Sequence, residues 1–80
     1  MRIKVYFGDR LIISYMIVDP TDKLRKWTNR IAHTLQMLSL QVRDVDFFTS
    51  RGYKMSTRTT FDEAFPDVEI GVLELYKKRR

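Results

Sequence analysis

The hydrophobic period of the chain changes once, at the DPTD sequence of residues 19–22, and this change constrains the fold more than any other feature. Before it, apolar and polar residues alternate, which predicts a strand over residues 2–7. After it, apolar residues recur at three- and four-residue steps and predict one amphipathic helix of about 15 residues, at Leu24, Trp27, Ile31, Leu35 and Leu38. Strands and one long helix bury their apolar faces against each other, so we expect a two-layer α+β fold.

The remaining segments predict further strands and one short helical turn. Turn residues precede the β-branched run LIISYMIV at 11–18, which predicts a second strand. The sequence TFDE is a capping box, with Thr60 as N-cap and Glu63 three residues later, and predicts one helical turn that Pro66 ends. Three more strands are expected, at 45–50, 53–55 and 68–76. The predicted order is β-β-α-β-β-short helix-β, a mixed sheet of four to five strands packed on one main helix.

Size and composition exclude several classes of protein. Eighty residues make one domain, and the absence of cysteine excludes disulfides and thiolate zinc sites. The first residues alternate like a strand and show no apolar signal segment. The longest apolar run, Leu11–Val18, is too short to cross a bilayer. We therefore expect an intracellular protein of the cytoplasm or nucleus with no membrane partner.

The net charge of +5 comes mostly from the end of the chain. Residues 1–76 hold 11 of the 15 basic residues and all 10 acidic ones, so this part is nearly neutral. We expect a folded domain over 1–76 and a basic tail over 77–80 that is disordered and dispensable for folding. The tail is a candidate for nucleic-acid binding or nuclear import, through Lys77, Lys78, Arg79 and Arg80.

Nothing in the sequence predicts an enzyme. His33 is the single histidine, and without a second histidine or any cysteine it has no partners for a triad or a metal site. Neighbouring carboxylates such as Asp44 and Asp46 fit solvated positions better than a general acid and base. There is no glycine-rich phosphate loop. We expect no catalytic, cofactor-binding or metal-binding residues.

Four motifs, in order, resemble those of ubiquitin. The start MRIKV is similar to MQIFV, VDPTDKL at 18–24 to VEPSDTI, TFDEAF at 60–65 to TLSDYN, and VLELYKKRR at 72–80 to LHLVLRLRGG. The resemblance to the ubiquitin-like superfamily implies a β-grasp fold in which the last strand lies beside the first. Conjugating members carry a C-terminal Gly-Gly, whereas the last glycine here is Gly71. The resemblance therefore implies a member that is not conjugated through its own C-terminus, or a modifier whose C-terminus is truncated.

Two shorter matches resemble the homologous-to-ubiquitin splicing modifiers. Those proteins carry NDRL at the first hairpin and end near LELYY, and this chain has GDRL at 8–11 and LELY at 73–76. That subfamily binds partners non-covalently through an acidic residue at the start of the main helix. Asp22 matches this position and is expected to receive an arginine of the partner. From its place before the helix, Asp22 also fits a helix-start residue that caps backbone N–H groups.

Two strands lack the polar residues expected on a solvated outer face. In residues 11–18, neither the odd-numbered nor the even-numbered positions are mainly polar. Phe47 and Phe48 are adjacent in a predicted strand, so their side chains must point to opposite faces. The resemblance to ubiquitin turns Phe47 inward and gives Phe48 the outer position of the main recognition residue. We expect an exposed apolar patch on two adjacent strands that binds a protein partner or a second copy of the chain. Its predicted members are Ile13, Tyr15, Ile17 and Phe48.

The expected function is non-covalent protein recognition through the outer sheet face. The alternative is an RNA-associated or splicing accessory protein that uses the tail and the basic helix face. That helix face consists of Lys23, Arg25, Lys26 and Arg30.

Overall fold

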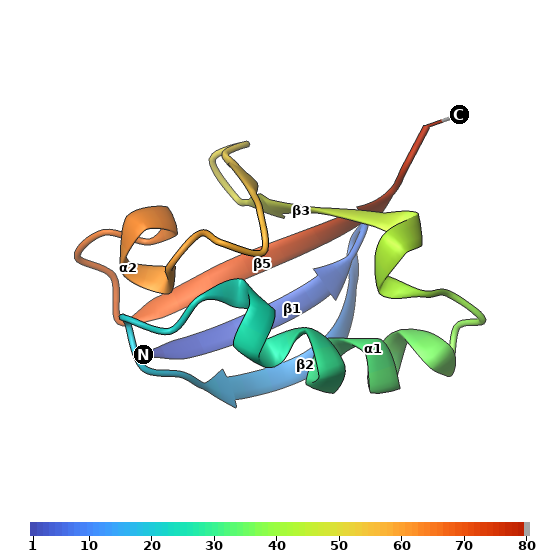
Figure 1. Ribbon diagram of the computed structural model, residues 1–80, viewed down its shortest axis with the longest axis horizontal. Coiled ribbons are helices and arrows are strands. Elements are labelled where there is room, and N and C mark those ends of the chain that lie inside the picture. The colour runs from blue at the N-terminus through green and yellow to red at the C-terminus, as the bar shows by residue number, and fades with distance from the viewer. Residues whose placement is uncertain (80) are drawn as a thin grey trace.

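The computed structural model describes residues 1–79 and has the element order that the sequence predicts. One main helix packs on a five-stranded mixed sheet, which makes the protein a small α+β domain (Figure 1). Two 3₁₀ turns, η1 and η2, flank the helix on either side along the chain. The elements are β1 (Arg2–Phe7), β2 (Arg10–Ile17), η1 (Leu24–Trp27), α1 (Thr28–Gln36), η2 (Val42–Asp44), β3 (Val45–Thr49), β4 (Lys54–Met55), α2 (Phe61–Ala64) and β5 (Ile70–Lys77).

The last strand lies in the middle of the sheet. The strands are arranged in the order β2-β1-β5-β3-β4, with β1 and β5 parallel and the other neighbours antiparallel. Helix α1 lies across one face of this sheet, here called the inner face (Figure 1). The opposite face is here called the outer face, and no helix within residues 1–79 lies on it (Figure 1).

Two register shifts in β2, one opposite Lys4 and one between the partners of Val5 and Tyr6, change which of its side chains point inward. Ile3 pairs with Met16 and Val5 pairs with Ile13, so the single residue Lys4 faces two residues of β2. Such an extra residue reverses the alternation of the bulged strand. Ile13 and Met16 are therefore both buried, with 4% and 3% of their surface exposed. The prediction that Ile13 belongs to an exposed outer patch is wrong for this reason.

The predicted helical segment over residues 24–38 covers the inner face with its apolar side chains, although it does not form one continuous α-helix. Its first turn is η1, and α1 begins at Thr28. The helix ends in a Schellman arrangement, in which the Leu40 amide donates to the Leu35 carbonyl at 3.0 Å and Ser39 has a φ of 59°. The core on this face consists of Ile3, Val5, Ile13, Met16, Val18, Leu24, Ile31, Leu35, Val45, Phe47, Met55, Phe61, Phe65, Leu73 and Leu75.

The predicted capping box and its short helix are confirmed. The Thr60 hydroxyl accepts a hydrogen bond from the Glu63 amide, and the Glu63 carboxylate accepts one from the Thr60 amide. This turn places Phe61 and Phe65 in the core. The ring of Phe65 lies against Gly71, where a Cβ atom would come within 2.9 Å of it. A glycine is therefore needed at the start of β5 to let the α2 segment close over the sheet.

The predicted boundary between domain and tail is too early. Lys77 is the last residue of β5 and pairs with Val45, and the Lys78 amide donates to the Asp44 carbonyl at 2.8 Å. Strand β5 continues because β3 offers backbone partners as far as Val45. Strand β5 and its backbone hydrogen bonds therefore extend past the predicted boundary as far as Lys78, whereas the predicted disorder of the tail stays a prediction and Arg80 lies outside the described residues.

Candidate interaction site on the outer sheet face

The sheet register places one row of outward side chains across all five strands. Residues that pair directly across neighbouring strands point to the same face. Since Ile3, Val5, Leu73 and Leu75 point inward, their sequence neighbours point outward. The row consists of Leu11, Tyr6, Glu74, Phe48 and Lys54, on β2, β1, β5, β3 and β4 in that order.

Aromatic and apolar side chains surround Glu74 on this face. The rings of Phe48 and Tyr76 meet edge to face, with 5.9 Å between their centroids and 70° between their planes. Tyr6 lies on the other side of Glu74, and Val72 precedes it on the same face of β5. We call Tyr6, Phe48, Val72 and Tyr76 the outer aromatic patch. The edge-to-face geometry of its aromatic pair is a favourable one.

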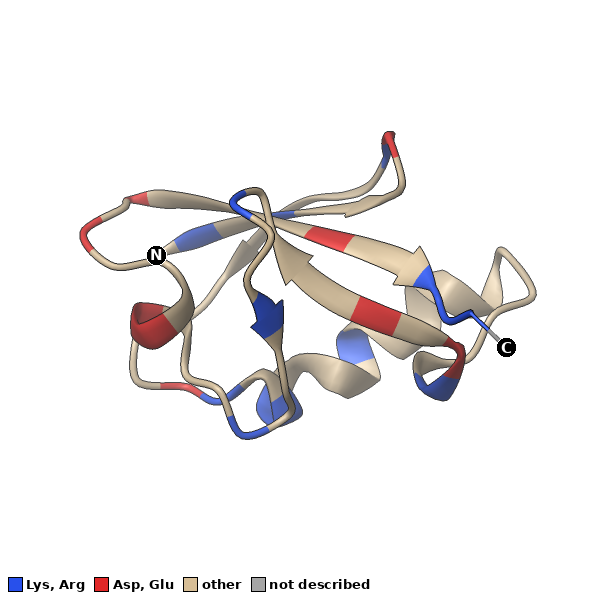
Figure 2. Cartoon of the chain, turned by 90° about the horizontal axis from the view of Figure 1, so that it is seen from above, with Lys and Arg blue, Asp and Glu red and all other residues tan. Residues whose placement is uncertain are grey.

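Two carboxylates of this face contact neighbouring side chains, whereas a third, Asp9, lines a hollow with Tyr6, Val72 and Tyr76. Glu74 accepts a hydrogen bond from the Tyr76 hydroxyl at 2.6 Å, which raises the pKa of Tyr76. Asp46 lies 3.5 Å from the ammonium of Lys54. Figure 2 shows these acidic positions on the two strands that also carry the aromatic pair. The cations that line a hollow together with Phe48 and Tyr76 are Lys54, Lys77, Lys78 and Arg79.

Tyr15 and Ile17 point outward as predicted, but they form a separate area. Their side chains are 48% and 74% exposed, and the Tyr15 ring lies below the cations of Arg2 and Lys4 at 5.8 and 5.5 Å. Strands β1 and β5 lie between β2 and β3. The expectation that Tyr15 and Phe48 stand on adjacent strands is therefore wrong, although they share the outer face.

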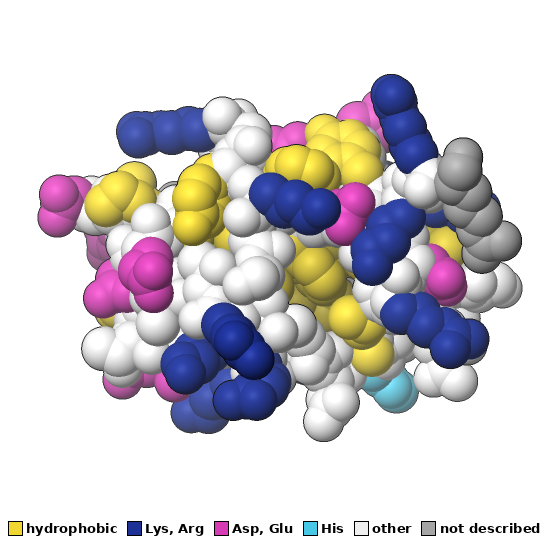
Figure 3. Space-filling view, turned by 45° about the horizontal axis from the view of Figure 1, so that its top comes forward, with side chains coloured by type: hydrophobic (Ala, Val, Ile, Leu, Met, Phe, Trp, Pro, Cys, Tyr) yellow, Lys and Arg dark blue, Asp and Glu magenta, His cyan; other side chains and the backbone are white. Residues whose placement is uncertain are grey.

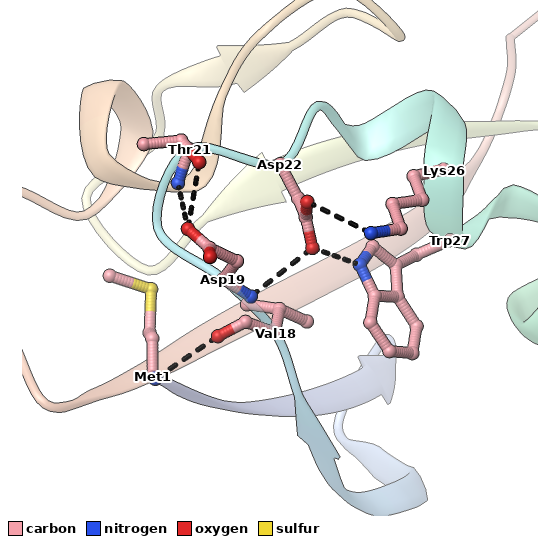
Figure 4. A network of polar contacts seen from close by, with 7 residues as sticks. All are labelled: Met1, Val18, Asp19, Thr21, Asp22, Lys26 and Trp27. Carbon is pink, nitrogen blue, oxygen red and sulfur yellow. Dashed lines mark hydrogen bonds and ion pairs between the residues drawn. The ribbon is translucent and has the colours of Figure 1, made fainter.

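Asp22 lies in a network of intrachain contacts away from this face (Figure 4). Its Oδ2 atom accepts hydrogen bonds from the Trp27 indole Nε1 and the Asp19 amide, both at 3.2 Å. Its Oδ1 atom lies 3.2 Å from the ammonium of Lys26. The residue before η1 is Lys23, and no side chain caps that turn. The expectation that Asp22 caps backbone N–H groups at the start of the helix is therefore wrong.

These contacts lower the pKa of Asp22. The indole hydrogen bond from Trp27 has the largest effect, partial burial opposes it, and the Asp19 amide and Lys26 add to the lowering. The carboxylate thus fastens the start of the helical segment to the end of β2. Its side chain is only 13% exposed, so a partner's arginine would compete with Lys26 for Oδ1. That role for Asp22 stays a prediction.

The sequence reasoning missed three of the four members of the outer aromatic patch. Tyr6, Val72 and Tyr76 alternate with buried residues of β1 and β5. This alternation could have indicated that the three side chains point to the outer face. What it could not show was the residue-by-residue register of β1 against β5, which pairs Tyr6 with Glu74 and so brings the three side chains together.

No protein-family model matches the chain, and no curated protein matches it. Among residues 1–79, no three His, Cys, Asp or Glu side chains are grouped in a way that could hold a metal ion. In the same part of the chain, no helix has the length and apolar character needed to cross a membrane.

Proposed function

We propose that this chain is a ubiquitin-like β-grasp domain that binds a partner protein non-covalently through the outer aromatic patch. The fold assignment is supported by the central position of β5, parallel to β1, and by the single helix across the inner face. The order of the four sequence motifs supports it independently. Gly71 lies inside β5, where a Cβ atom would meet Ile3 and Phe65, so this glycine serves the packing of the sheet.

One observation carries the functional proposal. Phe48 and Tyr76 form an edge-to-face aromatic pair on a sheet face that no described helix covers. Two-layer domains normally keep such a face polar. Aromatic side chains lose little conformational entropy on binding and dominate the energy of protein interfaces. The patch therefore fits an interface better than a solvated surface.

The charges around the patch define the chemistry of the partner. Glu74 and Asp46 are occupied by Tyr76 and Lys54, whereas the cations of residues 77–79 line the neighbouring hollow. A complementary surface has an apolar side chain that enters between the aromatic rings and carboxylates that face the cations. We propose a partner protein with this arrangement.

Affinity capture with single variants tests the proposal. The immobilised protein is incubated with nuclease-treated extract of its source, and bound proteins are compared between wild type, Phe48→Ala and Tyr76→Ala. Truncation of an aromatic anchor costs about 2 kcal/mol of binding free energy, so each variant should bind about 30-fold more weakly. Met37→Ala, which truncates a side chain that is 82% exposed beyond the end of α1, is the matched control and should bind normally.

Two results would change this conclusion. Equal capture by wild type and both aromatic variants would contradict the proposed site. Concentration-dependent dimerisation in sedimentation experiments, abolished by Phe48→Ala, would instead assign the patch to a second copy of the chain.

A further inference from the structure

A second surface, on the helix side of the sheet, carries a concentration of positive charge. Figure 3 shows several Lys and Arg side chains gathered in the lower part of that view. Backbone contacts place the basic residues of η1 and of the position before it beside a basic residue in the turn that precedes α2. We call them the basic cluster: Lys23, Arg25, Lys26 and Arg58, all exposed.

Backbone hydrogen bonds bring the two segments of the cluster together. The Arg25 amide donates to the Thr57 carbonyl at 2.9 Å, and the Leu24 amide donates to the Thr59 carbonyl at 3.0 Å. Lys23 forms an isolated β-bridge with Thr60. Arg58 lies between these anchored residues, so the fold fixes it beside η1 although it is distant in sequence.

The turn that carries Arg58 is itself held by local hydrogen bonds. The Ser56 amide donates to the Thr59 hydroxyl at 3.0 Å, and the Arg58 amide donates to the Ser56 hydroxyl at 3.2 Å. Thr59 is buried, with 8% of its surface exposed. The guanidinium of Arg58 is thus presented from a fixed backbone, which lowers the entropic cost of binding a ligand there.

Most of the charge in the cluster is not neutralised by the chain. Lys26 is paired with Asp22 at 3.2 Å. Within residues 1–79, however, no carboxylate lies within ion-pair distance of Lys23, Arg25 or Arg58. Like charges held together repel one another, and a bound anion relieves that repulsion.

The character of the surface indicates which anion fits. None of the large exposed hydrophobic side chains belongs to η1, α1 or the turn over residues 56–60. Trp27, the aromatic residue of η1, is partly buried, so a protein partner would find little exposed apolar surface here. Contacts to phosphate need none, and the guanidinium groups of Arg25 and Arg58 match phosphate geometry. We propose that the basic cluster binds the phosphate backbone of a nucleic acid without reading its bases.

Fluorescence anisotropy of labelled nucleic acids tests this inference. The probes are an oligo(U) strand of about 20 nucleotides and a DNA duplex of about 20 base pairs, titrated with the full chain at roughly 50 to 200 mM salt. The variant Lys23→Gln/Arg25→Gln/Arg58→Gln removes the three uncompensated cations. On the duplex, the slope of log affinity against log salt should become shallower by about 2.7, since each phosphate contact contributes about 0.9. Affinity at the lowest salt should fall at least about tenfold.

A charge-matched variant separates a local site from net charge. Lys77→Gln/Lys78→Gln/Arg79→Gln removes the same charge at the end of β5 and should keep the slope of the wild type. Equal losses in the two triple variants would overturn the inference, as would the absence of binding to both probes at about 100 μM protein and low salt. Equally tight, cluster-dependent binding of poly-glutamate would also overturn it, because the cluster would then select charge and not phosphate.

Two further controls keep these results interpretable. Circular dichroism checks that the triple variant is folded, and Arg58→Gln alone replaces it if it is not, with a slope change of about 0.9. Phe48→Ala lies on the outer face and should bind nucleic acid like the wild type. Nucleic-acid binding by the basic cluster and protein binding by the outer aromatic patch are therefore tested by different variants.

Discussion

The two faces of the sheet use similar residues in different ways. On the inner face, Val5, Leu73 and Leu75 have no exposed surface because α1 and the α2 segment cover them. On the outer face, Tyr76 is 45% exposed, and Phe48 is only half-buried although its ring packs against Tyr76. Both faces are rich in apolar side chains, but only one of them is covered by the described part of the chain.

This difference shows that apolar character alone does not identify the core. Side chains on the inner face contribute to stability because folding removes them from water. Side chains on the outer face gain little on folding and are available to a partner. Variants of the two faces should therefore separate into those that lose stability and those that lose binding.

Phe47 and Phe48 should show the largest contrast, because they are adjacent in β3 and point to opposite faces. Phe47 has 6% of its surface exposed, so Phe47→Ala should reduce the free energy of unfolding by about 3–5 kcal/mol. Phe48→Ala should reduce it by less than about 1 kcal/mol and should weaken partner capture. Denaturant unfolding followed by circular dichroism measures both values. If Phe48→Ala were the more destabilising change, the faces of β3 would be exchanged and the outer aromatic patch would be wrong.

The sequence was sufficient for most of the fold because its signals are local. The strand alternation of residues 2–7, the stripe over 24–38 and the capping box at Thr60 each act over a few residues. These signals fixed the order and type of the elements. They could not show that the helical stripe opens with a 3₁₀ turn, since that depends on contacts of Leu24 and Arg25 with the turn over 56–60.

The candidate site was harder to predict because it depends on pairing between distant strands. The bulge opposite Lys4 turns Ile13 inward, and a period of two cannot reveal an extra residue in a strand without polar positions. Tyr76 meets Phe48 only because β5 pairs with β3. Asp22 fits a helix cap in sequence, whereas Trp27 and Lys26 compete successfully for its carboxylate.

Gly71 and Val72 allow the same comparison of inner and outer face in β5, where the expected change in unfolding free energy is smaller. A Cβ atom at Gly71 would lie 2.8 Å from Ile3 and 2.9 Å from Phe65, so Gly71→Ala should cost about 1–3 kcal/mol of unfolding free energy. Val72→Ala, one residue along on the outer face, should cost less than about 1 kcal/mol. Thermal unfolding of the two variants measures the difference. An unchanged melting temperature for Gly71→Ala would mean that the α2 segment does not pack tightly over the inner face.

The smallest effect is expected at Asp22, which fastens the helical cover to the inner face. Its folded-state pKa is lowered from 3.8, mainly by the Trp27 indole, so the carboxylate contributes stability above its ordinary pKa. This contribution is lost as the pH falls through 3.8 and through the lower pKa of the folded state. Asp22→Asn should therefore unfold more easily than the wild type at neutral pH and should lose less stability on acidification.

Urea unfolding at neutral pH and at about pH 3 tests this expectation, since the linkage acts between these values. Asp9→Asn removes the same charge from an exposed position in the first hairpin and is the control for net charge. Asp19 has a pKa lowered by the Thr21 amide and hydroxyl, so part of the acid sensitivity should remain in Asp22→Asn. If Asp22→Asn and the wild type lost equal stability on acidification, the Asp22 contacts would not hold the helix to the sheet. If partner capture fell while stability stayed constant, Asp22 would act in binding, as its resemblance to the splicing modifiers implies.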